Sequence, residues 1–112
     1  MLFKNAQGVE YEVIFRKPDK RTWGEDCDGV CFYPNDNENK SKIYINPYRT
    51  NQTQLNTIIH EVAHAFFWDK KEYEIKKYAD TMSRLLYNKL KWRKIGPGWG
   101  SKKKVEKNMG SW

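Results

Sequence analysis

Alternating hydrophobic and polar residues in the first half of the chain predict short strands. Val9–Arg16 alternates and is rich in β-branched and aromatic residues, which is typical of a half-buried strand. Two further strands are predicted at the short, mainly apolar runs Gly29–Tyr33 and Lys42–Asn46. A proline follows each run and ends it. Residues 17–28, rich in turn-forming and acidic side chains, and the polar segment 35–41 are expected to be loops. We therefore predict a small, three-stranded, mainly antiparallel sheet.

The second half changes to a helical period. Apolar residues recur at the spacing i, i+3, i+4, i+7 that marks an amphipathic helix. They are Leu55, Ile58, Ile59, Val62, Ala63, Phe66 and Phe67. Asn51 and Gln54 resemble a capping box, so this helix is expected to run from about Gln52 to Trp68.

A second helical pattern follows after a short turn. Its apolar positions are Ile75, Tyr78, Ala79, Met82, Leu85, Leu86 and Leu90. Asp69 and Glu72 resemble the cap and its reciprocal partner. Two helices joined by so short a turn are expected to pack as an αα-hairpin, and with the sheet they make an α+β fold.

Charge divides the chain into a balanced body and a basic tail. The 112 residues suffice for one domain with one modest core. Gly96-Pro97-Gly98 ends the helical pattern, so we predict one domain over residues 1–95 and a flexible tail over 96–112. Of the net charge of +7, residues 91–112 contribute +6, because seven lysines and arginines stand there against Glu106. The tail is therefore the basic part of the molecule.

Three roles are open for this tail. It is expected to be a solvated segment that aids solubility, a nucleic-acid contact, or a means of recruiting an acidic protein. The nucleic-acid interpretation depends on Lys102, Lys103 and Lys104, which can neutralise phosphates. Trp92, Trp99 and Trp112 lie around them in the sequence and can stack on bases.

The chain shows no sign of a membrane or secretory protein. Its first ten residues include several polar side chains and no long apolar run, and nowhere do about eighteen apolar residues follow one another. Cys27 and Cys31 lack the second pair that a structural zinc knuckle needs. We expect a soluble, monomeric, cytoplasmic protein, in the host cytoplasm if the chain is viral, with its two cysteines reduced.

The sequence His60-Glu61-Val62-Ala63-His64 lies well inside the first helix and has the form of a zinc site. Residues four positions apart share one helix face, so His60 and His64 are expected to bind a single Zn²⁺. Glu61 lies one position round the helix, where it is placed to act as general base on a zinc-activated water. The chain has two histidines, and both fall in this motif. The pattern therefore predicts hydrolytic zinc chemistry.

A catalytic zinc normally has a third protein ligand, which here is expected to be a carboxylate. The candidates after the motif are Asp69, Glu72, Glu74 and Asp80. Asp69 and Glu72 have an alternative role in the helix cap, and Glu74 lies at the border of the apolar stripe, so we select Glu74. Asp80 is a candidate to accept a hydrogen bond from a ligating histidine ring. Glu72 and Asp80 remain open as third ligands.

Two further parts of the site are expected near the motif. Tyr48, Tyr73 or Tyr78 is expected to help stabilise an oxyanion, and nothing in the sequence selects among them; we keep Tyr78 as the candidate. The strand containing Ile43, Tyr44 and Ile45 is nearest in sequence to the helix. It is therefore the candidate edge along which an extended peptide substrate would bind, unless it is a central strand.

These segments resemble the ImmA/IrrE-type metallopeptidases, most of all their minimal phage-encoded relatives. The resemblance rests on Asp28-Gly29-Val30, Lys42-Ile43-Tyr44-Ile45 and Leu55–Phe66, and on Glu74, Tyr78 and Ala79 in the second helix. It implies a minimal zincin-like domain in which a strand precedes the active-site helix, His60 and His64 bind zinc, Glu61 is catalytic, and a glutamate of the next helix completes the site. The connection between His64 and Glu74 is shorter than is common in that family, and Ile75 and Lys76 stand where a small residue and Asn are usual.

Two functions from different classes follow. The first is a zinc metalloprotease that cleaves an intracellular protein. The second is a catalytically silent zinc-binding module that binds nucleic acid or a protein through its basic tail. Glu61 favours the first, because a structural zinc requires four protein ligands and no general base.

Overall fold

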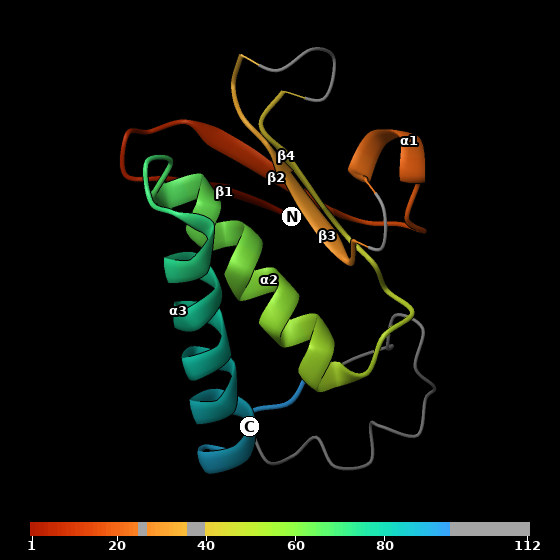
Figure 1. Ribbon diagram of the computed structural model, residues 1–112, viewed down its shortest axis with the longest axis vertical. Helices are drawn as coiled ribbons and strands as arrows, with labels where there is room; N and C mark the ends of the chain where they lie inside the picture. The colour runs from red at the N-terminus through yellow and green to blue at the C-terminus, as the bar shows by residue number, and fades with distance from the viewer. Residues whose placement is uncertain (25–26, 36–39, 95–112) are drawn as a thin grey trace.

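The computed structural model describes residues 1–24, 27–35 and 40–94, and Figure 1 shows their arrangement. The strands are β1 (Leu2–Lys4), β2 (Glu10–Phe15), β3 (Gly29–Phe32) and β4 (Lys42–Ile45), and the helices are α1 (Lys20–Trp23), α2 (Asn51–Phe66), α3 (Glu72–Arg84) and the π-helical turn η1 (Leu85–Lys89). This is the predicted α+β class. The basic tail 96–112, with Lys102, Lys103 and Lys104, lies outside the described residues.

The sheet has four strands and is mixed, which corrects the expected three antiparallel strands. Its order is β1-β2-β4-β3. β1 pairs antiparallel with β2 and β3 pairs antiparallel with β4, whereas β2 and β4 run parallel, with Val13 opposite Ile43. In the part of the chain that the structure describes, β3 is therefore an edge strand of the sheet and β4 is a central strand.

Side-chain burial explains why β4 lies in the centre. Ile43 and Ile45 are fully buried and join Tyr11 and Val13 in the core beneath α2. Tyr44 points to the opposite face, where it is 5 % exposed. A continuous apolar run needs cover on both faces of the sheet, and only a central strand provides it here.

The short helix α1 covers the second face of the sheet. It lies within segment 17–28, for which we expected a loop. The ring of Trp23 stacks on that of Tyr44 with centroids 5.8 Å apart. Asp19 caps the helix, because its carboxylate accepts a hydrogen bond from the backbone N–H of Arg21 at 3.0 Å. Trp23 thus helps to cover the apolar centre of the sheet on this side, where Phe32 and Arg16 also contact the Tyr44 ring.

The two long helices form the expected hairpin. α2 lies between the sheet and α3 (Figure 1). Its N-cap is Thr50, one residue before the predicted Asn51, and the Thr50 hydroxyl accepts from the N–H of Thr53 at 3.2 Å. α3 begins at Glu72, three residues after the predicted cap Asp69. Among the described residues, no helix is long and apolar enough to cross a membrane.

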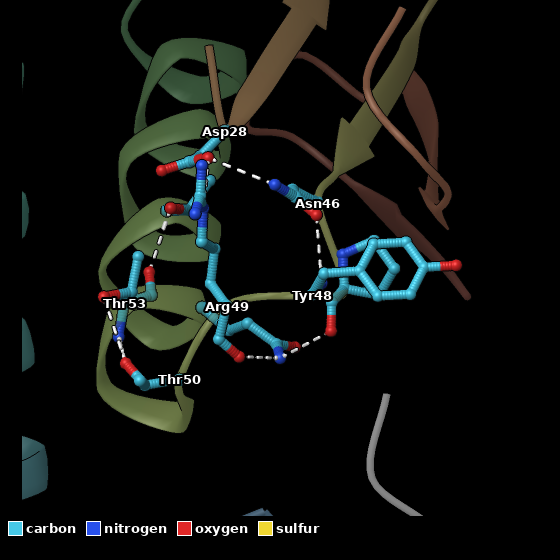
Figure 2. A network of polar contacts seen from close by, with 9 residues as sticks. Asp28, Asn46, Tyr48, Arg49, Thr50 and Thr53 are labelled. Atoms are coloured by element: carbon cyan, nitrogen blue, oxygen red, sulfur yellow. Dashed lines mark hydrogen bonds and ion pairs between the residues drawn. The ribbon is translucent and has the colours of Figure 1, made fainter. Parts of the chain in front are cut away.

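A polar network anchors the loop between β4 and α2 to the start of β3 (Figure 2). Asp28 accepts from Arg49 Nε at 2.8 Å and from Asn46 Nδ2 at 3.2 Å. The amide of Gln54 donates to the carbonyl oxygens of Pro47 and Arg49. Because the network joins strand, loop and helix, it fixes the position of β3 beside α2.

Candidate metal centre

His60 and His64 lie on one face of α2, as their spacing predicts. Their ring centroids are 4.9 Å apart, and each side chain is less than one fifth exposed. The small residues Ala63 and Ala65, which precede and follow His64 and point to different sides of the helix, are both buried and let α2 pack closely against its neighbours. The packing of α2 therefore directs both rings away from the core and towards α3.

Glu72, the first residue of α3, lies against both rings. One carboxylate oxygen is 3.0 Å from His60 Nε2 and the other is 2.9 Å from His64 Nε2. The three groups offer ligand atoms that all lie within 4.8 Å of one another. Ligand atoms on a tetrahedral zinc are separated by roughly 3.3 Å. Two imidazole nitrogens and a carboxylate thus form a donor set of the type that catalytic zinc sites use, and a modest inward movement of the side chains would give the spacing that zinc requires.

Glu74, which we selected from the sequence as third ligand, is not in this cluster. Its carboxylate accepts from the backbone N–H of Lys71 at 3.4 Å at the start of α3. Its side chain lines a different, apolar hollow together with Phe67 and Tyr73. The two glutamates have therefore exchanged their expected roles: Glu74 interacts with the helix terminus and Glu72 faces the histidines.

Glu61 lies in the same cavity as the cluster and is almost buried. It is 8 % exposed and faces Gly29 at the start of β3. Burial, together with the smaller effect of the nearby negative charge of Glu72, raises the pKa of Glu61 to about 8. A carboxyl group with a pKa close to neutrality is suited to accept and return a proton.

Gly29 makes the close approach of β3 to Glu61 possible. A Cβ atom at this position would lie 2.5 Å from Thr57 Cγ2 and 3.1 Å from Glu61 Cγ. The absence of a side chain therefore lets the edge strand pass directly beside the face of α2 that carries Thr57 and Glu61.

Replacing Gly29 with alanine is expected to destabilise the protein by about 1–3 kcal/mol, because the new methyl group overpacks this contact. Urea unfolding measures the change. Thr57→Ser removes the clashing methyl group and keeps the hydroxyl that donates to the Thr53 carbonyl at 2.9 Å. The double variant should therefore recover a large part of the loss, and equal instability of the single and double variants would contradict the packing explanation.

The cavity at the cluster has a volume of about 600 Å³ and lies along the outer edge of β3. Its wall includes Asp28, Gly29, Val30 and Cys31 in an unbroken run. The expected substrate strand containing Ile43, Tyr44 and Ile45 is β4. This strand lies between β2 and β3 and pairs with both. That expectation is wrong, because the edge next to the site belongs to β3.

Burial lowers the pKa of His60, and neighbouring charges modify that effect. Glu72 raises the pKa of His60, whereas His64 and, more weakly, Lys76 lower it. The net direction favours the neutral imidazole at neutral pH. A neutral ring is the form that binds a metal ion.

No family model, curated protein or solved structure matches this chain. The comparisons therefore assign it no family. The donor set, the buried carboxyl group and the edge strand beside them are the features from which a function is inferred.

Two other expected site residues lie elsewhere. Asp80 accepts a hydrogen bond from Asn56 Nδ2 at 2.9 Å, and this bond lowers the pKa of Asp80. Asp80 therefore contacts the side-chain amide of Asn56 on α2 and not the expected histidine ring. Tyr78 is 48 % exposed and lines the hollow on the far side of α3 with Tyr73. Tyr48 is exposed at the loop before α2. None of these three tyrosines lines the cavity that the described residues form.

The cavity contains polar residues that were not expected from the sequence, among them Tyr33, Asn56 and Lys76. Tyr33 follows β3, Asn56 is one turn before His60, and Lys76 is one turn after Glu72. Asn56 and Lys76 had a signal, since each lies four positions from a cluster residue on the same helix. Tyr33 had none, because its position depends on the course of the chain after β3.

Proposed function

We propose that this chain is a zinc-dependent metallopeptidase that hydrolyses peptide bonds of a protein substrate in the cytoplasm. The observation that supports this most is the placement of Glu61 in one cavity with His60, His64 and Glu72. The sequence resemblance to the ImmA/IrrE-type metallopeptidases supports the same class. The cluster comes from a single chain, which is consistent with a monomeric enzyme.

The residues divide into ligands and a base. His60, His64 and Glu72 would hold Zn²⁺, which when bound supplies an activated water and polarises the peptide carbonyl. Glu61 takes a proton from the attacking water and passes it to the amine that leaves. Its burial supports this role, because a carboxyl group with a raised pKa retains the proton until the leaving nitrogen accepts it.

The outer edge of β3 is the proposed binding surface for the peptide. An extended substrate can pair with the backbone of residues 29–32 and so lie across the cavity beside Glu61. Main-chain pairing supplies affinity with little dependence on sequence. Gly29 keeps this part of the edge narrow, so the scissile bond can approach the base closely.

Glu61→Gln tests this function. The variant is expected to keep about one zinc per chain and to lose at least about 1000-fold in hydrolysis, because the amide cannot accept the proton. Zinc is measured by elemental analysis, and cleavage by mass spectrometry of new N-termini in a mixture of unfolded cytoplasmic proteins. Glu74→Gln is the matched control, since it removes a carboxylate from the same site region but not from the cavity.

The alternative function makes the opposite prediction. If zinc binds to the wild type and neither protein produces new N-termini, the chain is a silent zinc-binding module. If the wild type binds no zinc, the proposed ligand set is wrong.

A further inference from the structure

Beyond ligands and base, hydrolysis needs a group that stabilises the negative charge formed on the carbonyl oxygen. Tyr78, the expected candidate, faces the hollow on the far side of α3. This donor is therefore expected among the polar groups that line the cavity.

Most of these groups already use their hydrogens. The two amide hydrogens of Asn56 go to Asp80 Oδ1 at 2.9 Å and to Ser83 Oγ at 3.1 Å. The hydroxyl of Thr57 donates to the Thr53 carbonyl at 2.9 Å. These side chains hold α2 and α3 in place and have no hydrogen to offer a reacting group.

Lys76 differs from Asn56 and Thr57 in its positive charge and in its exposure to solvent. Among the described residues that line the cavity, it is the one lysine or arginine. It lies one turn after Glu72 on the same face of α3. Its ammonium group forms an ion pair with Asp80, with Nζ 3.7 Å from Oδ2, and the side chain is 66 % exposed. Exposed ion pairs of this kind contribute little free energy, so the ammonium group can exchange Asp80 for another anion. A flexible stem and three rotatable donors allow such a group to turn towards a reacting oxygen.

The position of Lys76 brings a positive charge to the wall of the cavity that holds the cluster. Among the described residues, Asp28, Glu61 and Glu72 are the acidic ones that line the same cavity. An ammonium group in this wall favours an anion that forms in the cavity.

We infer that Lys76 is a catalytic residue that binds the oxyanion of the tetrahedral intermediate, an inference that rests on the proposed peptidase function. Water oxygen forms a bond to the carbonyl carbon, and the π electron pair moves to the carbonyl oxygen. Lys76 donates a hydrogen bond to that oxygen and keeps its proton. The pair then re-forms the carbonyl as the C–N bond breaks, and the nitrogen receives the proton that Glu61 took from water.

The test uses an anionic tetrahedral probe and therefore needs no knowledge of the substrate. Cobalt(II) is placed in the site, and its visible spectrum is followed while methylphosphonate is added. In a parallel titration the probe is neutral imidazole. Lys76→Met is expected to weaken methylphosphonate binding by about tenfold or more, because a charge-assisted hydrogen bond is lost, and to leave imidazole binding unchanged. Lys76→Arg should retain most of the affinity.

Two controls separate this role from others. Lys77→Met removes the same charge from the next residue, whose side chain lines the hollow on the other side of α3, and should bind both probes like the wild type. Tyr33→Phe removes the hydroxyl of the tyrosine that lines the cavity and should also bind both probes like the wild type.

Other results would overturn the inference. Unchanged methylphosphonate binding in Lys76→Met would do so, as would an equal loss in Lys77→Met, which would indicate general surface charge. A loss confined to Tyr33→Phe would assign the oxyanion to that phenol. A wild type that gives no cobalt spectrum would instead contradict the proposed metal site itself.

Discussion

Glu72→Ala is expected to weaken zinc binding by about 100-fold or more, because it removes one of the three proposed protein ligands and leaves two imidazoles alone. The carboxylate oxygens lie 2.9 and 3.0 Å from the two ring nitrogens, so the carboxylate is already beside both histidines. Competition with a chromophoric chelator at fixed pH measures the affinity.

Glu74→Ala is the matched control for this experiment. Glu74 is two residues further along the same helix, has the same side chain and contacts the helix terminus. Its removal should change zinc affinity by less than about threefold, with at most a small loss of stability from the weakened cap. Equal losses in the two variants would show that the cluster geometry does not determine the third ligand.

The metal-free protein is expected to lose about 2 kcal/mol of unfolding free energy between about pH 6.5 and 8, because of Glu61. Its folded pKa of about 8 lies above the ordinary value of 4.5. In this range the folded state binds more protons than the unfolded state, so stability falls as pH rises. His60, whose pKa is lowered from 6.5, acts in the opposite sense only below that pH.

Glu61→Gln should remove this pH dependence, since the amide does not titrate. Urea unfolding in the presence of a chelator, at pH 6.5 and at pH 8, gives the two free energies for each protein. Glu74→Gln should retain the wild-type slope. If Glu61→Gln and the wild type lose stability in parallel, the burial of this carboxyl group does not control the slope. A bound divalent cation favours the carboxylate form, so zinc should reduce the same dependence in the wild type.

Much of the fold was visible in the sequence, since local patterns specify local structure. The long period-3.6 stripe predicts α2 within two residues at each end, and it places both histidines on one face. β2, β3 and β4 are also predicted, because each is a short apolar run between turn residues.

The arrangement of the strands was not visible in the same way. β1 has only three residues, which is too short for a visible alternation of apolar and polar positions. It is a strand because it pairs with β2. The parallel pairing of β2 with β4 is set by packing between distant segments. The fully apolar run Ile43-Tyr44-Ile45 nevertheless carried a signal for a central strand, because a half-exposed strand would alternate.

The third ligand shows how a small error in a helix boundary changes a site. Residues two apart on a helix point roughly 200° apart, so Glu72 and Glu74 cannot face the same neighbour. The cap assigned to Asp69 gave Glu72 a competing role, whereas α3 in fact begins at Glu72. The buried residues Ile75 and Ala79 lie three and seven positions after Glu72. Residues at this spacing share one helix face, so Glu72 lies on the face of α3 that is turned towards the rest of the protein.

The two halves of the proposed ligand set differ in how firmly the fold holds them. The histidines belong to α2, which packs on the sheet, whereas Glu72 opens a helix that packs chiefly on α2. An ion bound by all three would therefore act as a cross-link across the turn 67–71. Part of its binding energy would fasten α3 to the domain, so that acquiring metal and completing the tertiary structure become a single thermodynamic event.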